Sequence, residues 1–282
     1  MKEKLIVWIL NSSLVRSSVI IKIGRFCMGL RKKEFIEIEG RKMFCHGNDG
    51  LALSLFKTYE PVQTEIVKKF VKKGDNVIDV GAHVGYYTFL MSKLVGESGK
   101  VFSFEPDPDN FNLLKKGVEV NNLKNVEIIQ KAVSKENSKI KLYLSDTDRA
   151  TNRIYDAGIN DAHKIIEVDT CSIDEFLNEK RIKINFIKID AEGSEQGVID
   201  GMKGIIKNNV QLIIMTEFFP FLIKKYGSTP EKYLDTIKEL GYNIYNILED
   251  GTLPEIKKED ISIFSNVKNY CTNVLCTRIK MK

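Results

Sequence analysis

Short apolar runs alternate along the chain with longer stretches in which apolar residues recur every three or four positions. The short runs predict β-strands, and the periodic stretches predict helices. We expect strands at 77–80, 101–104, 126–129, 140–144, 165–168, 186–190, 212–215, 242–248 and 273–277, and helices at 62–71, 88–94, 108–120 and 230–240. Near-continuous apolar strands separated by helices indicate an α/β fold whose parallel sheet is covered on both faces. Ligands of such sheets bind beyond the carboxyl ends of the strands.

Local signals predict where several helices begin and end. Asp107 followed by Pro108 has the sequence of an N-cap and first helical position. Gly74 is expected to cap the carboxyl end of the helix at 62–71. Residues 172–175 have the sequence of a capping box at the start of a short helix, whereas the mixed-charge stretch 256–260 is expected to be a surface turn.

The amino-terminal part differs in composition from the rest. Residues 1–46 are expected to form a basic, apolar extension with short strands at its end, and residues 47–282 to form one main domain. Ten Lys and Arg stand against four Glu in residues 1–42, while the whole chain carries a net charge of +5. The longest apolar run, Leu5–Leu10, is far shorter than the roughly 20 residues that span a membrane. The extension therefore either packs on the body or on a second subunit, or lies on a membrane surface as an amphipathic helix.

Composition excludes several classes of protein. The 282 residues are 43% hydrophobic and include 19 Gly and 6 Pro, which rules out collagenous and disordered chains. Five Cys without a CxxC pair predict free thiols in a reducing cytoplasm. Because the body beyond residue 42 is nearly neutral, nucleic acid is an unfavoured partner.

A glycine turn follows the first strand of the main domain. Asp79, Gly81 and Gly85 form a D-x-G-x-x-x-G pattern between strand and helix, and Glu105 ends the next strand. Glycines permit a tight turn beside a helix N-terminus, and an acidic residue at that place can accept hydrogen bonds from ribose hydroxyls. A dinucleotide turn would require glycines where His83 and Tyr86 stand, and no P-loop is present. A nucleoside without pyrophosphate fits best, with S-adenosylmethionine as the natural candidate.

A second polar site follows the strand at 186–190. Lys188 lies inside a strand that is otherwise buried, where an unpaired charge is costly, and Asp190 or Glu192 can pair with it. These three residues are either a structural ion pair or the lining of a methyl-acceptor pocket. In the second interpretation a lysine with a lowered pKa, or a carboxylate, takes the proton of a hydroxyl.

Glu217 ends the neighbouring strand, next to Asp190. Two carboxylates there could hold Mg²⁺, but only two ligands are visible, and a capping or substrate-hydroxyl role is simpler. We therefore predict no metal site.

The motifs VIDVGAHVGYYT, FSFEPDPDNF and FIKIDAEGSE, preceded by Tyr59-Glu60-Pro61, resemble the FkbM-type methyltransferases over roughly residues 58–218. The resemblance implies a class I methyltransferase fold, with a mostly parallel seven-stranded sheet and helices on both faces, and usually O-methylation of sugar-containing substrates. It places Glu60 over the cofactor and makes His83 loop scaffolding rather than a base. The cofactor residues expected from the turn and the resemblance together are Glu60, Asp79, Gly81, His83, Gly85, Tyr86, Thr88, Glu105, Pro106, Ala132 and Asp190.

The resulting hypothesis is S-adenosylmethionine-dependent O-methylation of a saccharide, glycolipid precursor or related small metabolite. The alternatives are an RNA methyltransferase, a non-catalytic cofactor-binding module and an NAD-dependent dehydrogenase, which the missing glycines disfavour. We expect a cytoplasmic protein, peripheral contact with a membrane through the amino-terminal extension, and self-association into a homo-oligomer as a further option.

Overall fold

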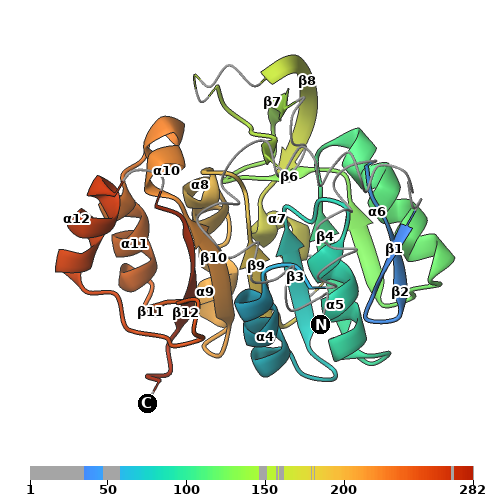
Figure 1. The fold of residues 1–282 in the computed structure, drawn as a ribbon, viewed down its shortest axis with the longest axis horizontal. Coiled ribbons are helices and arrows are strands. Elements are labelled where there is room, and N and C mark those ends of the chain that lie inside the picture. The colour runs from blue at the N-terminus through green and yellow to red at the C-terminus, as the bar shows by residue number, and fades with distance from the viewer. Residues whose placement is uncertain are drawn as a thin grey trace, which may run out of the picture.

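The computed structural model describes residues 35–46, 58–145, 151–156, 158, 162–178, 180, 182–267 and 270–281. Its main sheet contains β3 (Asn76–Val80), β4 (Lys100–Phe104), β5 (Val126–Ile129), β9 (Phe186–Ile189), β10 (Ile213–Phe218), β11 (Asn243–Asn246) and β12 (Thr272–Thr277). These seven strands lie in the order β11-β12-β10-β9-β3-β4-β5 (Figure 1). Only β12 runs against its neighbours β10 and β11. The predicted seven-stranded, mostly parallel α/β sheet is confirmed.

Helices cover both faces of this sheet, as predicted (Figure 1). They are α4 (Pro61–Phe70), α5 (Tyr86–Val95), α6 (Pro108–Val120), α7 (Ile173–Asn178), α8 (Glu195–Asp200), α9 (Lys203–Asn208), α10 (Pro220–Tyr226), α11 (Pro230–Glu239) and α12 (Lys258–Asn266). Successive strand residues point to opposite faces. Val77 and Phe186 therefore share a core with α4, α5 and α6, and Ile78 and Ile187 share the other core with α7, α8, α9 and α11.

Two predicted strands do not join the main sheet. Residues 140–144 and 165–168 belong to β7 (Lys139–Ser145) and β8 (Ala162–Cys171), which pair antiparallel. With β6 (Ala132–Val133) they form a separate three-stranded sheet that projects beyond the carboxyl ends of the main strands (Figure 1). Apolar runs show that strands form but not which partner each strand finds, so the sequence pattern alone did not separate the two sheets.

A hairpin precedes the main domain. β1 (Phe35–Ile38) and β2 (Arg41–Phe44) pair antiparallel, and Ile36, Ile38 and Met43 are buried in the core that contains α4 and α5. Arg41 Nη1 donates a hydrogen bond to the carbonyl oxygen of Phe89 at 2.6 Å. The predicted boundary at residue 46 stays a prediction, because residues 1–34 and 47–57 lie outside the described residues.

The helix ends correct several local predictions. α4 ends at Phe70 and its C-cap Val71 is extended, so Gly74 is not a cap but part of the following turn. Residues 256–260 do not form only a surface turn, because α12 begins at Lys258. Asp107 is confirmed as the N-cap of α6, where its carboxylate accepts the N–H of Asp109 at 2.9 Å.

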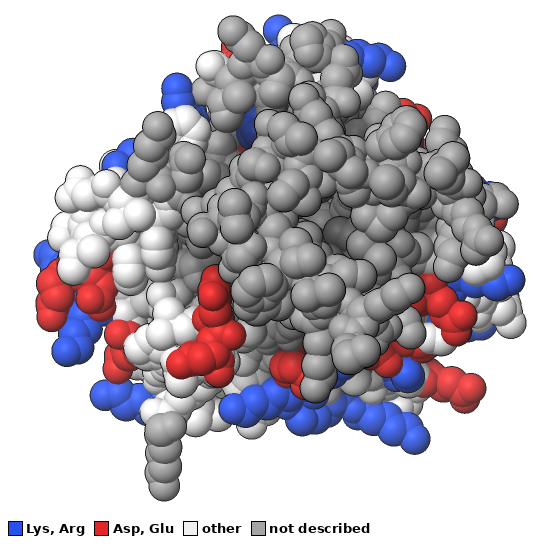
Figure 2. Space-filling view, in the orientation of Figure 1, with Lys and Arg blue, Asp and Glu red and all other residues white. Residues whose placement is uncertain are grey.

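Within the described part of the chain, no helix is both long and apolar enough to cross a bilayer. Figure 2 shows Lys and Arg side chains along the lower edge of one face, with Asp and Glu side chains directly above them. Charges of both signs therefore lie side by side along this edge.

Candidate functional site

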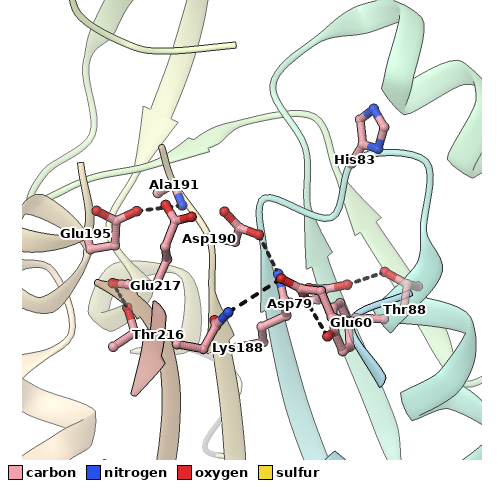
Figure 3. A network of polar contacts seen from close by, with 12 residues as sticks. Glu60, Asp79, His83, Thr88, Lys188, Asp190, Ala191, Glu195, Thr216 and Glu217 are labelled. Atoms are coloured by element: carbon pink, nitrogen blue, oxygen red, sulfur yellow. Dashed lines mark hydrogen bonds and ion pairs between the residues drawn. The ribbon is translucent and has the colours of Figure 1, made fainter. Parts of the chain in front are cut away.

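A row of polar side chains lies across one face of the main sheet, near the carboxyl ends of its strands. In the register of the sheet, Asp79 of β3 lies opposite Lys188 of β9, and Lys188 lies opposite Met215 of β10. Asp190 and Glu217 follow Lys188 and Met215 by two residues, so they point to the same face. Figure 3 shows the side chains of this row gathered at neighbouring strand ends.

Lys188 lies at the centre of the row. Its side chain is 3% exposed, and its Nζ lies 3.0 Å from Asp190 Oδ2 and 4.6 Å from the centre of the Tyr87 ring. Burial lowers the pKa of Lys188, but the charges of Asp190, Asp79 and Glu60 outweigh burial and raise it. The expectation of a lowered pKa was therefore wrong, and Lys188 keeps its proton at neutral pH. Its predicted place in the acceptor pocket stays a prediction.

Asp79 ties β3 to the first turn of α5. Its Oδ2 accepts the hydroxyl proton of Thr88 at 2.7 Å, and Thr88 Oγ1 also lies 2.8 Å from Ser103 Oγ. Asp79 is fully buried, and its Oδ1 has no hydrogen-bond partner among the described residues. Burial raises the pKa of Asp79, while Lys188 and Thr88 oppose that rise. The Asp79–Thr88 hydrogen bond thus links the strand before the glycine turn to the helix after it.

The glycine turn packs directly against the end of β9. Gly81 has φ +76°, and a Cβ built on it would lie 1.8 Å from the backbone oxygen of Asp190. At Gly85, where φ is +103°, a Cβ would lie 2.6 Å from Leu114 Cδ1 of α6. Both positions therefore require glycine for contacts within the protein. The first contact also holds the turn and the β9 strand end at a fixed separation.

Glu105 is anchored by the backbone on both sides. Its Oε2 accepts the N–H of His83 at 2.7 Å, and its Oε1 accepts the N–H of Asp107 at 2.9 Å. Burial raises the pKa of Glu105 to about 7. His83 has φ +50° and donates its backbone N–H to Glu105, and its predicted scaffolding role stays a prediction.

Glu60 reaches the polar row from the start of α4. It is the N-cap residue, with φ +43°, and its Oε2 accepts the Tyr87 hydroxyl proton at 2.7 Å. Its Oε1 lies 3.5 Å from Nδ2 of Asn273, a β12 residue. Burial raises the pKa of Glu60, whereas Lys188 lowers it. Glu60 therefore contributes to the charged cluster around Lys188.

The other predicted cofactor residues lie around this turn. The Tyr86 hydroxyl is 3.1 Å from Thr64 Oγ1 of α4. Pro106 directly follows Glu105 and is half-buried. Ala132 lies in β6, shortly after the end of β5, and is buried against β8, where it pairs with Thr170. None of these contacts identifies a ligand, so the roles of the three residues in cofactor binding stay predictions.

Four residues near the acidic strand ends were not assigned from the sequence. Glu195 of α8 accepts the N–H groups of Ala191 and Gly193 through Oε1, at 2.9 and 3.1 Å. The Tyr155 hydroxyl donates to the Glu192 carbonyl oxygen at 2.7 Å, and Cys271 and Asn273 come from around the start of β12. Glu195 stands in the FIKIDAEGSE motif, which was a usable signal. The other three are distant in sequence and carry no such signal.

Residues 151–156 cross the carboxyl ends of the strands. Asn152 Nδ2 donates to Asp107 Oδ2 at 2.7 Å, close to Glu105. The Tyr155 hydroxyl donates to the carbonyl oxygen of Glu192, just after β9. This segment therefore links the two halves of the candidate site.

Metal ligation has limited support. Among the described residues, no group of three or more His, Cys, Asp or Glu side chains is arranged to hold a metal ion. Asp190 is instead paired with Lys188.

Residues 79–244 match the family described as the methyltransferase FkbM domain, and this segment is more than half of the chain. The chain belongs to the FkbM methyltransferase family. The matched segment of this FkbM-family protein begins at Asp79 and includes the glycine turn, Glu105, the polar end of β9 and Glu217.

Individual relatives match the FkbM-family chain over shorter segments. Methyltransferase 1 of Beauveria bassiana (strain ARSEF 2860) is 23% identical in an alignment of 144 positions that covers 45% of this chain and 57% of that protein. A probable cobalt-precorrin-6B C(15)-methyltransferase (decarboxylating) of Sulfurisphaera tokodaii is 34% identical over 102 residues, or 36% of this chain and 46% of that protein. The structure of methyltransferase FkbM from Methylobacillus flagellatus KT aligns with a TM-score of 0.44 and 14% identity, covering 80% of this chain and 52% of that one. The chain thus spans about half the length of each.

The side chains of this FkbM-family site suit a nucleoside ligand. Each carboxylate oxygen of Glu105 can accept more than one hydrogen bond, and Oε2 accepts one from the backbone. A ribose hydroxyl is a suitable additional donor. The positions that a dinucleotide turn needs as glycines are His83 and Tyr86. Glu105 and the turn sequence therefore fit S-adenosylmethionine better than a pyrophosphate-containing cofactor.

Proposed function

We propose that this protein is an S-adenosylmethionine-dependent methyltransferase that methylates a hydroxyl group. One observation carries the proposal: the Gly81 turn is in direct backbone contact with Asp190, at the acidic end of β9. A nucleoside held by the turn and Glu105 would therefore have carboxylates next to it on the β9 and β10 side. Family membership and the glycine-turn chemistry both support this arrangement.

When bound, the cofactor supplies an electrophilic methyl group. The chain's own residues then have separate tasks. Glu105 accepts hydrogen bonds from the ribose hydroxyls, and Asp79 holds the turn through its hydrogen bond with Thr88. Lys188 stays charged and fixes Asp190, which with Glu192 lines the acceptor side. Alignment of the acceptor oxygen with the methyl carbon supplies much of the rate in such a transfer.

The proposed acceptor is a saccharide, a glycolipid precursor or a related small metabolite. This choice of acceptor class rests on the resemblance of the motifs to FkbM-type methyltransferases. Radiolabelled methyl transfer to a panel of methyl glycosides tests it, with adenosine and short RNA as parallel acceptors. Transfer to RNA but to no glycoside would contradict the proposal.

Calorimetric titration with S-adenosylhomocysteine tests the cofactor, with NAD as the parallel ligand. We expect binding of the homocysteine compound alone, weakened at least tenfold in Glu105→Gln. Glu37→Gln, which changes an exposed carboxylate on β1, is the matched control and should bind like the unchanged protein. Preferential binding of NAD would overturn the interpretation of the glycine turn.

We also propose that residues 1–46 mediate any peripheral contact with a membrane and that the enzyme works in the cytoplasm. Co-sedimentation with anionic liposomes, with and without residues 1–30, tests the membrane contact. Equal binding by both proteins would contradict it.

A further inference from the structure

Glu217 has a buried carboxylate oxygen that no described residue satisfies. Its Oε1 accepts the Cys271 thiol proton at 3.2 Å, while its Oε2 is buried and has no hydrogen-bond partner among the described residues. Leaving a buried acceptor unpaired costs free energy, so native proteins rarely do so without a reason. The Cys271 contact fixes the carboxyl group and leaves Oε2 available to another partner.

The surroundings of Glu217 give this oxygen a high proton affinity. Burial raises the pKa of Glu217 well above its usual value, and the nearby carboxylates reinforce the rise. The titratable groups that interact with it come from several elements, namely Tyr59, Tyr155, Asp190, Glu192, Glu195, Tyr233 and Cys271. A carboxylate with a raised pKa is a stronger base once it is ionised.

Three other ionisable groups near Glu217 are less suited to accept a proton from a ligand. Lys188 is held in its charged form, and Asp190 is its ion-pair partner. Glu195 also has an oxygen without a described partner, but the residue is 1% exposed and its other oxygen is held by two backbone N–H groups. Glu217 as a whole residue is half-buried, although its Oε2 is buried, and it lies one residue before the end of β10, beside the end of β9.

Glu217 is also close to the proposed cofactor turn. The backbone of Asp190 touches Gly81, and β10 is the next strand along from β9. Figure 3 shows the Glu217 side chain beside Asp190 and Ala191 at these strand ends. A ligand seated on the turn would therefore have Asp190 and Glu217 as neighbours.

We propose that Glu217 is the catalytic base that takes the proton from the acceptor hydroxyl. This inference rests on the proposed function. The acceptor O–H bond breaks and its proton moves to Glu217 Oε2, while a new C–O bond forms to the methyl carbon. The carbon–sulfur bond breaks, and its electron pair stays on sulfur. The proton later leaves Glu217 to solvent.

The first test needs no acceptor. S-adenosylmethionine carries a positive sulfonium that S-adenosylhomocysteine lacks, so its binding beside Glu217 should favour the ionised carboxylate. Calorimetry at neutral pH, in buffers of different ionisation enthalpy, counts the protons released by each ligand. We expect more protons released with S-adenosylmethionine, up to one per site. The difference should disappear in Glu217→Gln and persist in the matched variant Glu195→Gln.

The second test is turnover with a glycoside that accepts methyl groups. Glu217→Gln should lower kcat about 100-fold or more, as expected for loss of a general base, with an affinity for S-adenosylhomocysteine within threefold. Glu217→Asp should recover part of the rate, and the rise of kcat with pH should be absent in Glu217→Gln. Unchanged proton release or unchanged kcat in Glu217→Gln overturns the base assignment. Failure of the unchanged protein to bind S-adenosylhomocysteine refutes the proposed function instead.

Discussion

Gly81→Ala tests the contact between the glycine turn and the end of β9. The new Cβ would lie 1.8 Å from the backbone oxygen of Asp190. The backbone fixes the positions of both atoms, so rotating a side chain cannot relieve the clash. The turn after β3 and the loop after β9 must therefore move apart.

Two effects add to the cost. An L side chain in the left-handed region costs about 1 to 2 kcal/mol, and an overpacked contact adds about 1 to 3 kcal/mol. Gly74→Ala is the matched control, because Gly74 has φ +87° but its Cβ would meet only Ser98 Oγ at 3.5 Å. The control therefore carries the backbone term without the collision.

Guanidinium unfolding of both variants separates these terms. We expect Gly81→Ala to lower the free energy of unfolding by about 1 to 3 kcal/mol more than Gly74→Ala does. Calorimetry should also show weaker S-adenosylhomocysteine binding in Gly81→Ala alone. Equal unfolding midpoints and equal affinities in the two variants would refute the argument that this contact positions the site.

Three further changes test other parts of the site. Lys188→Met leaves the surrounding carboxylates without their counter-charge and should lower the free energy of unfolding by about 3 to 5 kcal/mol. Lys188→Arg should lower it less. A Lys188→Met variant as stable as the unchanged protein would contradict the ion-pair assignment. Burial raises the pKa of Glu105 from 4.5 to about 7, so the folded protein binds more protons than the unfolded chain between these values. Stability should therefore fall by roughly 3 kcal/mol as pH rises through that window, and urea unfolding of Glu105→Gln should show a flatter profile. Asp107→Ala removes the α6 cap and should cost about 1 kcal/mol in thermal unfolding, whereas Asp107→Asn should cost less.

Much of the site follows from local sequence. The strand, turn and helix around Asp79 and Gly85, the acidic end of β4 at Glu105 and the Asp107 cap all depend on residues close together in the chain. Local propensity, side-chain period and capping chemistry act over these short distances. The sequence was therefore sufficient to predict the central strands, their mostly parallel arrangement and the placement of polar residues at their carboxyl ends.

Other features depend on which distant segments meet. The register that sets Asp79 opposite Lys188, and the contact of Gly81 with Asp190, join β3 to a strand more than 100 residues away. The pKa of Lys188 is raised because Glu60, from the start of α4, and Asp79 add their charges to that of Asp190. β7 and β8 likewise form a separate sheet with β6. Burial, register and the sum of charges are properties of the packed structure, so tertiary structure alone decided the electrostatics of this site.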